Sequence, residues 1–129
     1  MIPPERNVMR SATFLIVLVS LFTQTLPVQA GDCRIDGPLP KLDSQPIEWT
    51  FAIAGGQRCL RGLRSGAMLL DSVVIASPAK FGEATTQGYS FSYKAPQEFK
   101  GEDAFSVVMS GKNRGVRGSS TIRVRVLVQ

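Results

Sequence analysis

Histidine is absent from this 129-residue chain. Without an imidazole the chain lacks the commonest general base, a frequent metal ligand and one member of a Ser-His-Asp triad. Heptads and internal repeats are also absent. The glycine-rich stretches at 55–56 and 111–118 do not precede a predicted helix, so neither is typical of a phosphate-binding loop. We therefore expect no enzyme activity, no cofactor and no metal site.

Catalysis by a pair of carboxylates does not need histidine. A pair of carboxyl groups can hydrolyse a glycosidic bond, and Glu98, Glu102 and Asp103 are the candidates. They lie on a predicted corner between two strands, where their presence already has a structural explanation. A cysteine nucleophile would be lost if the cysteines pair. We therefore do not favour a hydrolase.

The first thirty residues have the features of an export signal. Arg6 and Arg10 precede an apolar run over 12–22, which is too short to span a bilayer comfortably, and small residues at 28–30 suit signal peptidase. The pattern predicts a cleaved signal helix over 1–30, rather than a retained anchor. A lipoprotein is disfavoured, because Cys33 follows Asp32 instead of a lipobox. We expect an exported protein, periplasmic or secreted, with no membrane span after cleavage.

Two cysteines follow the predicted cleavage point, Cys33 and Cys59. In an oxidising compartment they are expected to form a disulfide, worth roughly 3 kcal/mol in the chain-entropy model. An intermolecular bridge or two free thiols are the alternatives. Cys33 lies in a proline-rich stretch without periodicity over 31–46, which predicts an irregular arm that needs a tether.

Alternation of apolar and polar residues predicts strands in the rest of the chain. The segment 67–76 is the exception: it fits a short helix or two short strands, and β-branched residues favour a loop followed by a strand. The last strand is expected to face the core with Ile122, Val124, Val126 and Val128. About seven strands with frequent turns predict an all-β sandwich in a single domain over 31–129. The other predicted strands cover 47–53, 57–63, 82–86, 89–94 and 103–109.

The central stretch carries a spaced motif of six residues: Tyr93, Pro96, Phe99, Gly101, Asp103 and Phe105. Together with Ser77-Pro78 and the alternating last strand, it resembles the bacterial Ig-like or cadherin-like domains over about 73–128. The resemblance implies an Ig-like sandwich of the kind found in tandem in surface proteins and adhesins. This domain is single, however, and it lacks the acidic clusters that bind calcium in cadherins, so we expect no calcium site.

Physical roles for the motif are structural. Phe99 is expected to plug the end of the sandwich, and Gly101 to permit a sharp corner. Asp103 is expected to accept backbone N–H groups and fix that turn, while Phe105 enters the core.

Basic residues gather in the last quarter of a chain whose net charge is +5. Three of them lie within a predicted hairpin loop over 110–119 and two follow on the last strand, so they are expected at one end of the sandwich. Two interpretations stay open: a patch that binds anions, or charges that guard an edge strand against aggregation, which is favoured. The residues are Lys112, Arg114, Arg117, Arg123 and Arg125.

The sequence thus predicts an exported, non-catalytic Ig-like binding or envelope-associated module. Its expected contacts are anionic polysaccharide, the cell surface or an envelope protein. The alternative is a structural accessory subunit that docks by its sheet edge to a larger envelope assembly. Nucleic acid is not expected as a partner, because no aromatic residue is interleaved with the basic patch to stack on bases.

Overall fold

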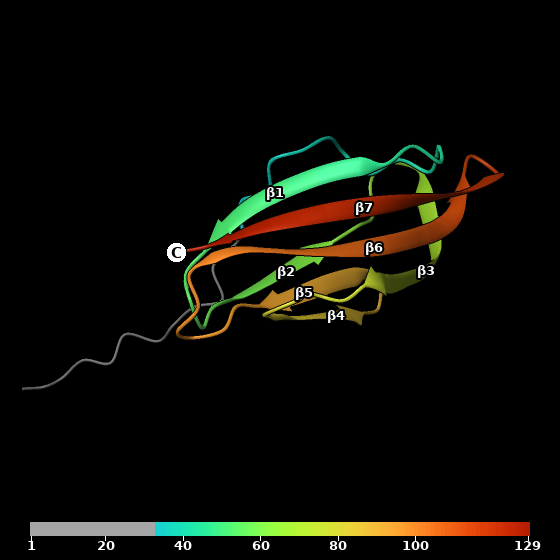
Figure 1. Cartoon of the computed structure of the whole chain (residues 1–129). Helices are drawn as coiled ribbons and strands as arrows, with labels where there is room; N and C mark the ends of the chain where they lie inside the picture. Colours follow the sequence, from blue (N-terminus) through green and yellow to red (C-terminus); the bar gives the residue numbers. More distant parts are fainter. Residues whose placement is uncertain (1–32) are drawn as a thin grey trace, which may run out of the picture.

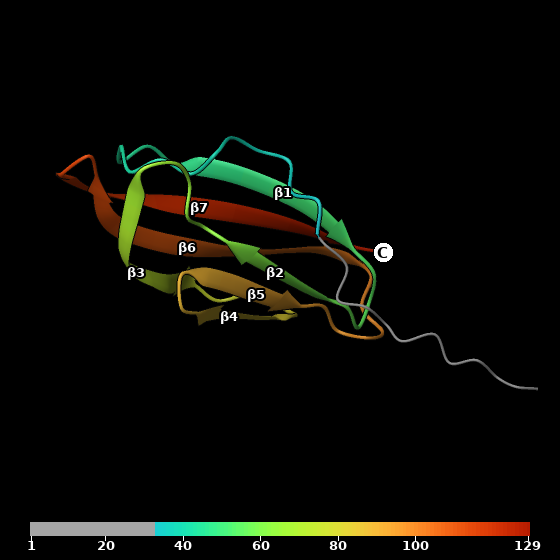
Figure 2. The same cartoon turned by 180° about the vertical axis from the view of Figure 1, so that it is seen from behind.

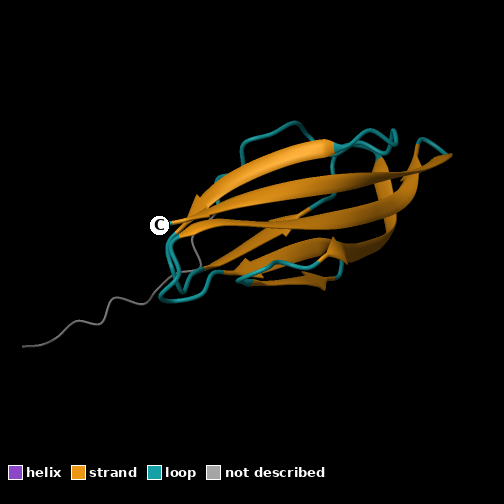
Figure 3. Cartoon of the chain, viewed as in Figure 1, coloured by secondary structure: helices purple, strands orange, loops and turns teal. Residues whose placement is uncertain are grey.

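The computed structural model describes residues 33–129, and the predicted signal peptide lies outside the described residues. Over this range the regular structure consists entirely of strands (Figure 3), which confirms the all-β prediction. A helix long and apolar enough to cross a membrane is not found in 33–129. The seven strands are β1 (Ile47–Ile53), β2 (Arg58–Gly62), β3 (Met68–Ser77), β4 (Glu83–Gln87), β5 (Ser90–Lys94), β6 (Gly101–Asn113) and β7 (Val116–Val128).

The strands form two sheets that pack as the layers of a β-sandwich (Figures 1 and 2). The four-stranded sheet has the order β1-β7-β6-β3, and the three-stranded sheet has the order β2-β5-β4. β1 and β7 are parallel, whereas every other strand pair is antiparallel. The last strand is therefore an interior strand, held between the first strand and β6.

Alternation on β1 and β7 builds one wall of the core. The inward residues of β7 predicted from the sequence, from Ile122 to Val128, are all buried. Aromatic side chains from both sheets fill the space between them. The ring of Tyr93 lies 5.9 Å from that of Phe51 and 5.5 Å from that of Phe105, measured between centroids. This packing fixes β5 against the four-stranded sheet.

Two local predictions are corrected. The segment 67–76 is neither a helix nor a loop followed by a strand, because β3 runs unbroken from Met68 and absorbs Asp71 in a register irregularity. Such a bulge lets a strand carry one extra polar residue without ending. The strand predicted over 89–94 begins one residue later, because Tyr89 lies in the turn before β5 and is 43% exposed.

The predicted hairpin loop over 110–119 is also wrong. β6 and β7 remain paired up to Asn113 and Val116, and only two residues form the turn. Both of these, Arg114 and Gly115, have positive φ, as tight hairpins require. Glycine in this stretch serves close packing, because a Cβ on Gly111 would collide with the backbone of β3. The glycine content that suggested a loop therefore belongs to a strand.

The arm before β1 covers the outer edge of that strand. Asp36 and Thr50 exchange two backbone hydrogen bonds of 2.9 and 3.0 Å, and the Trp49 indole N–H donates to the carbonyl of Pro38 at 2.7 Å. The backbone bonds between Asp36 and Thr50 satisfy polar groups on the edge of β1 that would otherwise face solvent.

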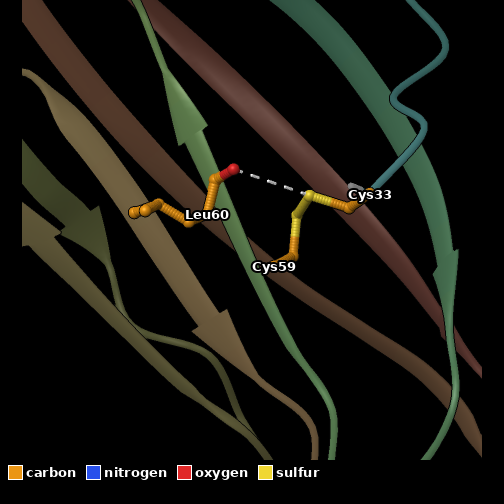
Figure 4. The surroundings of a disulfide bond; sticks show 3 residues. All are labelled: Cys33, Cys59 and Leu60. Carbon is orange, nitrogen blue, oxygen red and sulfur yellow. Dashed lines mark hydrogen bonds between the residues drawn. A yellow bond between two sulfur atoms is a disulfide. The ribbon is translucent and has the colours of Figure 1, made fainter. Parts of the chain in front are cut away.

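The predicted disulfide between Cys33 and Cys59 is confirmed, with 5.3 Å between the two Cα atoms (Figure 4). Cys33 Sγ also lies 4.0 Å from the carbonyl oxygen of Leu60. Because Cys59 belongs to β2, the bond ties the arm of one sheet to a strand of the other.

Candidate anion-binding face

The predicted basic residues that belong to strands lie on one side of the β6–β7 ribbon, but they are not gathered at one end of the molecule. Arg117, Arg123 and Arg125 occupy alternate positions of β7, so they point to the same outward face; we call them the β7 arginine row. At about 3.3 Å per residue, the ends of this row lie roughly 26 Å apart along the strand. Lys112 pairs with Arg117 across the ribbon, and Arg114 lies in its turn. The expectation of a single cluster at one end is thus corrected.

The edge-guard interpretation is wrong for Arg123 and Arg125. Residues 122–128 of β7 are flanked on both sides, with Glu48 and Ser106 as the register partners of Arg123, and Thr50 and Ala104 as those of Arg125. Arg117 precedes this part and has a strand partner only on β6. The edges of this sheet are β1 and β3. A doubly paired strand segment has no free backbone edge to protect, so edge protection does not explain Arg123 and Arg125.

Two arginines of the row make exposed ion pairs. Arg117 bonds to Asp71 at 2.6 Å, and Arg123 bonds to Glu48 at 3.2 Å. Pairs this exposed contribute about 0–1 kcal/mol, so a ligand can replace them at little cost. Arg125 makes no ion pair with any residue in 33–129.

A shallow hollow of about 610 Å³ opens beside Arg123 and Arg125 on this face. Its volume lies within the range of small-molecule sites. Small side chains leave the space on the β6 and β3 side of the two arginines, whereas Glu48 lies on the opposite side, beside Arg123 on β1. Guanidinium groups and hydroxyls therefore surround an opening that an oxygen-rich anion can enter. The small residues are Ala76, Ser77, Ala104, Ser106 and Thr121.

Asp103 is buried directly beneath this face, at 2% exposure. Its carboxylate oxygen Oδ2 accepts the Tyr93 hydroxyl at 2.7 Å and the Gly82 N–H at 2.8 Å. Oδ1 accepts the N–H groups of Lys80 and Ala104, both at 2.9 Å, and Phe81 N–H lies 3.3 Å from each oxygen. The carboxylate therefore fixes the loop between β3 and β4, and not the corner at Gly101 as the sequence led us to expect.

Gly82 is required for this arrangement. Its backbone passes so close to the Tyr93 ring that a Cβ would overlap the phenol, while its N–H points to Asp103. Glycine alone allows the loop backbone to approach this closely.

Hydrogen bonds decide the protonation state of Asp103. Burial raises the pKa of this carboxyl group, but the bonds donated by Gly82, Tyr93, Lys80 and Ala104 outweigh burial and hold the pKa below its usual value. Burial, with the neighbouring carboxylate, raises the pKa of Tyr93 well above that of a free phenol. The pair is thus a carboxylate beside a neutral phenol at neutral pH.

The remaining predicted residues lie around this centre. Phe105 is buried in the core, Phe99 is half-buried, and Gly101 begins β6 with a φ of +140°. Glu98 and Glu102 are exposed, whereas Asp103 is enclosed by its donors, so the three carboxyl groups of the hydrolase hypothesis have different surroundings. Within 33–129, no three cysteine or carboxylate side chains gather as a metal site.

Lys80 and Phe81 adjoin the face and were not identified from the sequence. Phe81 is 47% exposed, and the Lys80 ammonium lies 5.3 Å from the centroid of its ring. The sequence feature that could have indicated them is Phe81 itself, a bulky aromatic residue just before Gly82 in a short connection between two strands.

Comparison with known proteins gives one partial similarity. No protein-family model matches the chain, and no curated protein matches it. A solved structure of a sialyltransferase from Photobacterium damsela is similar over 64% of this chain, with a TM-score of 0.42 and 12% identity. The match covers 18% of that protein, so this chain spans a small part of its length. The chain's own residues therefore carry the functional proposal.

Proposed function

We propose that the domain is an exported, non-catalytic Ig-like module that binds anionic polysaccharide at the cell surface. Strand order supports the Ig-like assignment. If the seven strands are lettered A to G, the sheets contain C, F and G in one layer and B, E and D in the other, as in immunoglobulin sandwiches. The first strand differs, since it lies beside G. The disulfide supports export, because such bonds persist in oxidising compartments.

The β7 arginine row carries the binding proposal. It presents exposed cations along one face of β7, and Arg123 and Arg125, which lie where both neighbouring strands are paired, border the hollow. Its length of roughly 26 Å is too great for a small anion to reach both ends. A linear polymer with repeated negative charges can contact the whole row at once, and each contact adds to the others.

Retention on heparin resin across a salt gradient tests this proposal. The test variant changes Arg117, Arg123 and Arg125 to serine. The matched control changes Arg34, Arg58 and Arg61 to serine, which removes the same charge without touching β7. We expect the wild type and the control to elute at high salt, and the row variant to elute early, because exposed charge contacts weaken as salt screens them.

If both variants lose retention on heparin to the same extent, net charge alone sets the retention, and the proposed binding face is overturned. Equal retention of the row variant, the control and the wild type would leave the row without a binding role and favour the alternative, a subunit that docks by its sheet edge to a protein. One observation supports that alternative. β4 is an outer strand whose register with β5 has no bulge, and it contains neither proline nor lysine to block a further strand.

A further inference from the structure

We propose that Lys80 and Phe81 form a sugar-binding subsite that extends the hollow beside Arg125. The inference rests on the proposed function and narrows it: the ligand is an acidic polysaccharide recognised through its sugar rings, not any polyanion. Four features of the described residues support it.

The first feature is continuity. A second hollow of about 320 Å³ is lined by Lys80, Phe81 and Glu102, and it shares Ala104 and Arg125 with the first hollow. A third hollow, of about 460 Å³, also has Phe81 in its lining. Arg125 thus lies between the first and second hollows, and Phe81 lies between the second and third. A linear polysaccharide can therefore pass along all three hollows.

The second feature is the exposed ring of Phe81. It stacks on the half-buried Phe99, with 4.3 Å between centroids and 20° between ring planes. Phe99 supports the ring from the core side and keeps its orientation. The Lys80 ammonium already lies near this ring as a cation–π partner. A sugar ring can lay its C–H face on Phe81, while the displaced ammonium meets the carboxylate of that sugar.

The third feature is rigidity. The backbone N–H groups of three successive residues, Lys80, Phe81 and Gly82, all donate to the buried Asp103 carboxylate. The loop is therefore ordered before any ligand arrives. A preorganised platform loses less conformational entropy on binding than a free loop would. Asp103 acts here as a positioning residue.

The fourth feature is the mixture of charges. Glu102 lines the second hollow together with Lys80 and Arg125. A site for a bare polyanion gains nothing from an exposed carboxylate, which repels the ligand. A sugar ring carries hydroxyl groups that donate to a carboxylate and accept from cations. The lining therefore suits a hydroxylated acidic sugar better than a polyphosphate.

Calorimetric titration of the purified, oxidised protein tests the subsite with two probes, oligogalacturonate and inorganic polyphosphate. Phe81→Ala should weaken oligogalacturonate binding about tenfold and leave polyphosphate binding unchanged. Phe81→Trp keeps a flat ring and should bind like the wild type. Phe81→Leu keeps an apolar contact with Phe99 but has no ring face, so it should lose as much affinity for oligogalacturonate as Phe81→Ala. This variant distinguishes loss of the ring from a folding defect caused by alanine. Leu69→Ala, at a residue 62% exposed on β3, is the matched surface control.

The outcomes separate the two proposals. If the β7 row variant loses oligogalacturonate while Phe81→Ala and Phe81→Leu bind like the wild type, the subsite is overturned and the arginine face stands. If none of these variants loses affinity, both proposals fail. Equal loss of both probes in Phe81→Leu would also overturn the subsite, because a sugar-specific contact cannot affect polyphosphate.

Discussion

At the scale of single residues, the buried carboxylate of Asp103 is the most consequential group in the domain. Moving a charge out of water costs several kcal/mol unless hydrogen bonds replace its hydration. Here backbone N–H groups and the Tyr93 hydroxyl do so, and the pKa of Asp103 stays below its usual value despite burial. The charge is therefore a stabilising centre as long as it remains ionised.

Acid should weaken the fold through this residue. A carboxyl group whose folded pKa lies below its unfolded value contributes stability that is present above about pH 4 and lost as the pH falls through the folded pKa. Asp103→Asn removes the charge and turns an amide donor toward N–H donors. It should cost about 3 kcal/mol or more near pH 7, and its stability should change less than that of the wild type below about pH 4. Urea unfolding across pH measures both effects.

Glu98→Gln is the control for that experiment, because Glu98 is an exposed carboxylate. It should shift stability by no more than about 0.5 kcal/mol. An Asp103→Asn protein as stable as the wild type at neutral pH, with the same acid dependence, would show that the hydrogen bonds to Asp103 contribute little.

At the scale of strands, alternation predicted which residues face the core but not which strands are neighbours. The inward residues of β7, such as Val124 and Val126, follow from period two alone. Strand order depends on contacts between distant segments, so nothing local to β7 indicates that β1 lies beside it. The glycines at 111 and 118 suggested a loop from the sequence alone. Their actual role is close packing against distant segments, which is also a long-range property that the local sequence does not show.

The same limit applies to the candidate face. The sequence identified Arg123 and Arg125 by their alternation, and it identified Asp103 as an acceptor of backbone N–H groups. It did not predict that Asp103 reaches the loop at Lys80 and Phe81, since more than twenty residues intervene. The subsite exists only because the sandwich brings β6 beside that loop.

The arm offers a prediction at this scale. Replacing Cys33 and Cys59 together with serine should cost roughly 3 kcal/mol, because the unfolded chain regains the freedom that the crosslink removed. The arm should also loosen where Asp36 bonds to Thr50. Hydrogen exchange by NMR should show faster exchange of the Thr50 amide, while interior amides of β7 keep their protection. Unchanged exchange at Thr50 would mean that hydrogen bonds and packing hold the arm without the disulfide.

At the scale of the whole molecule, the fold is closed by pairing its first and last strands. β1 has β7 as its only neighbour within the four-stranded sheet, and β7 also supplies four buried residues to the core. The domain therefore cannot assemble its larger sheet from the first six strands.

Removal of β7 should consequently abolish folding. A chain that ends at Gly115 should show the red-shifted fluorescence of a solvated Trp49, which is 2% exposed in the intact domain, and no cooperative urea transition. A chain lacking only Gln129 is the control: it loses the backbone bonds that Gln129 makes with Ile53 and Gly55 but keeps all of β7, and should unfold cooperatively. A buried tryptophan in the shorter chain would contradict this account.

The parallel pairing of β1 with β7 also determines how the domain bears mechanical load. Tension between the start of β1 and the end of β7 pulls the two strands past each other lengthwise, so all their hydrogen bonds resist together. The disulfide redirects that load. A pull applied at Cys33 passes through the bond to Cys59 on β2, and the enclosed loop that contains β1 cannot extend. Oxidation thus moves the point where tension enters the domain from β1 in the larger sheet to β2 in the smaller one, while the other end of the load stays on β7.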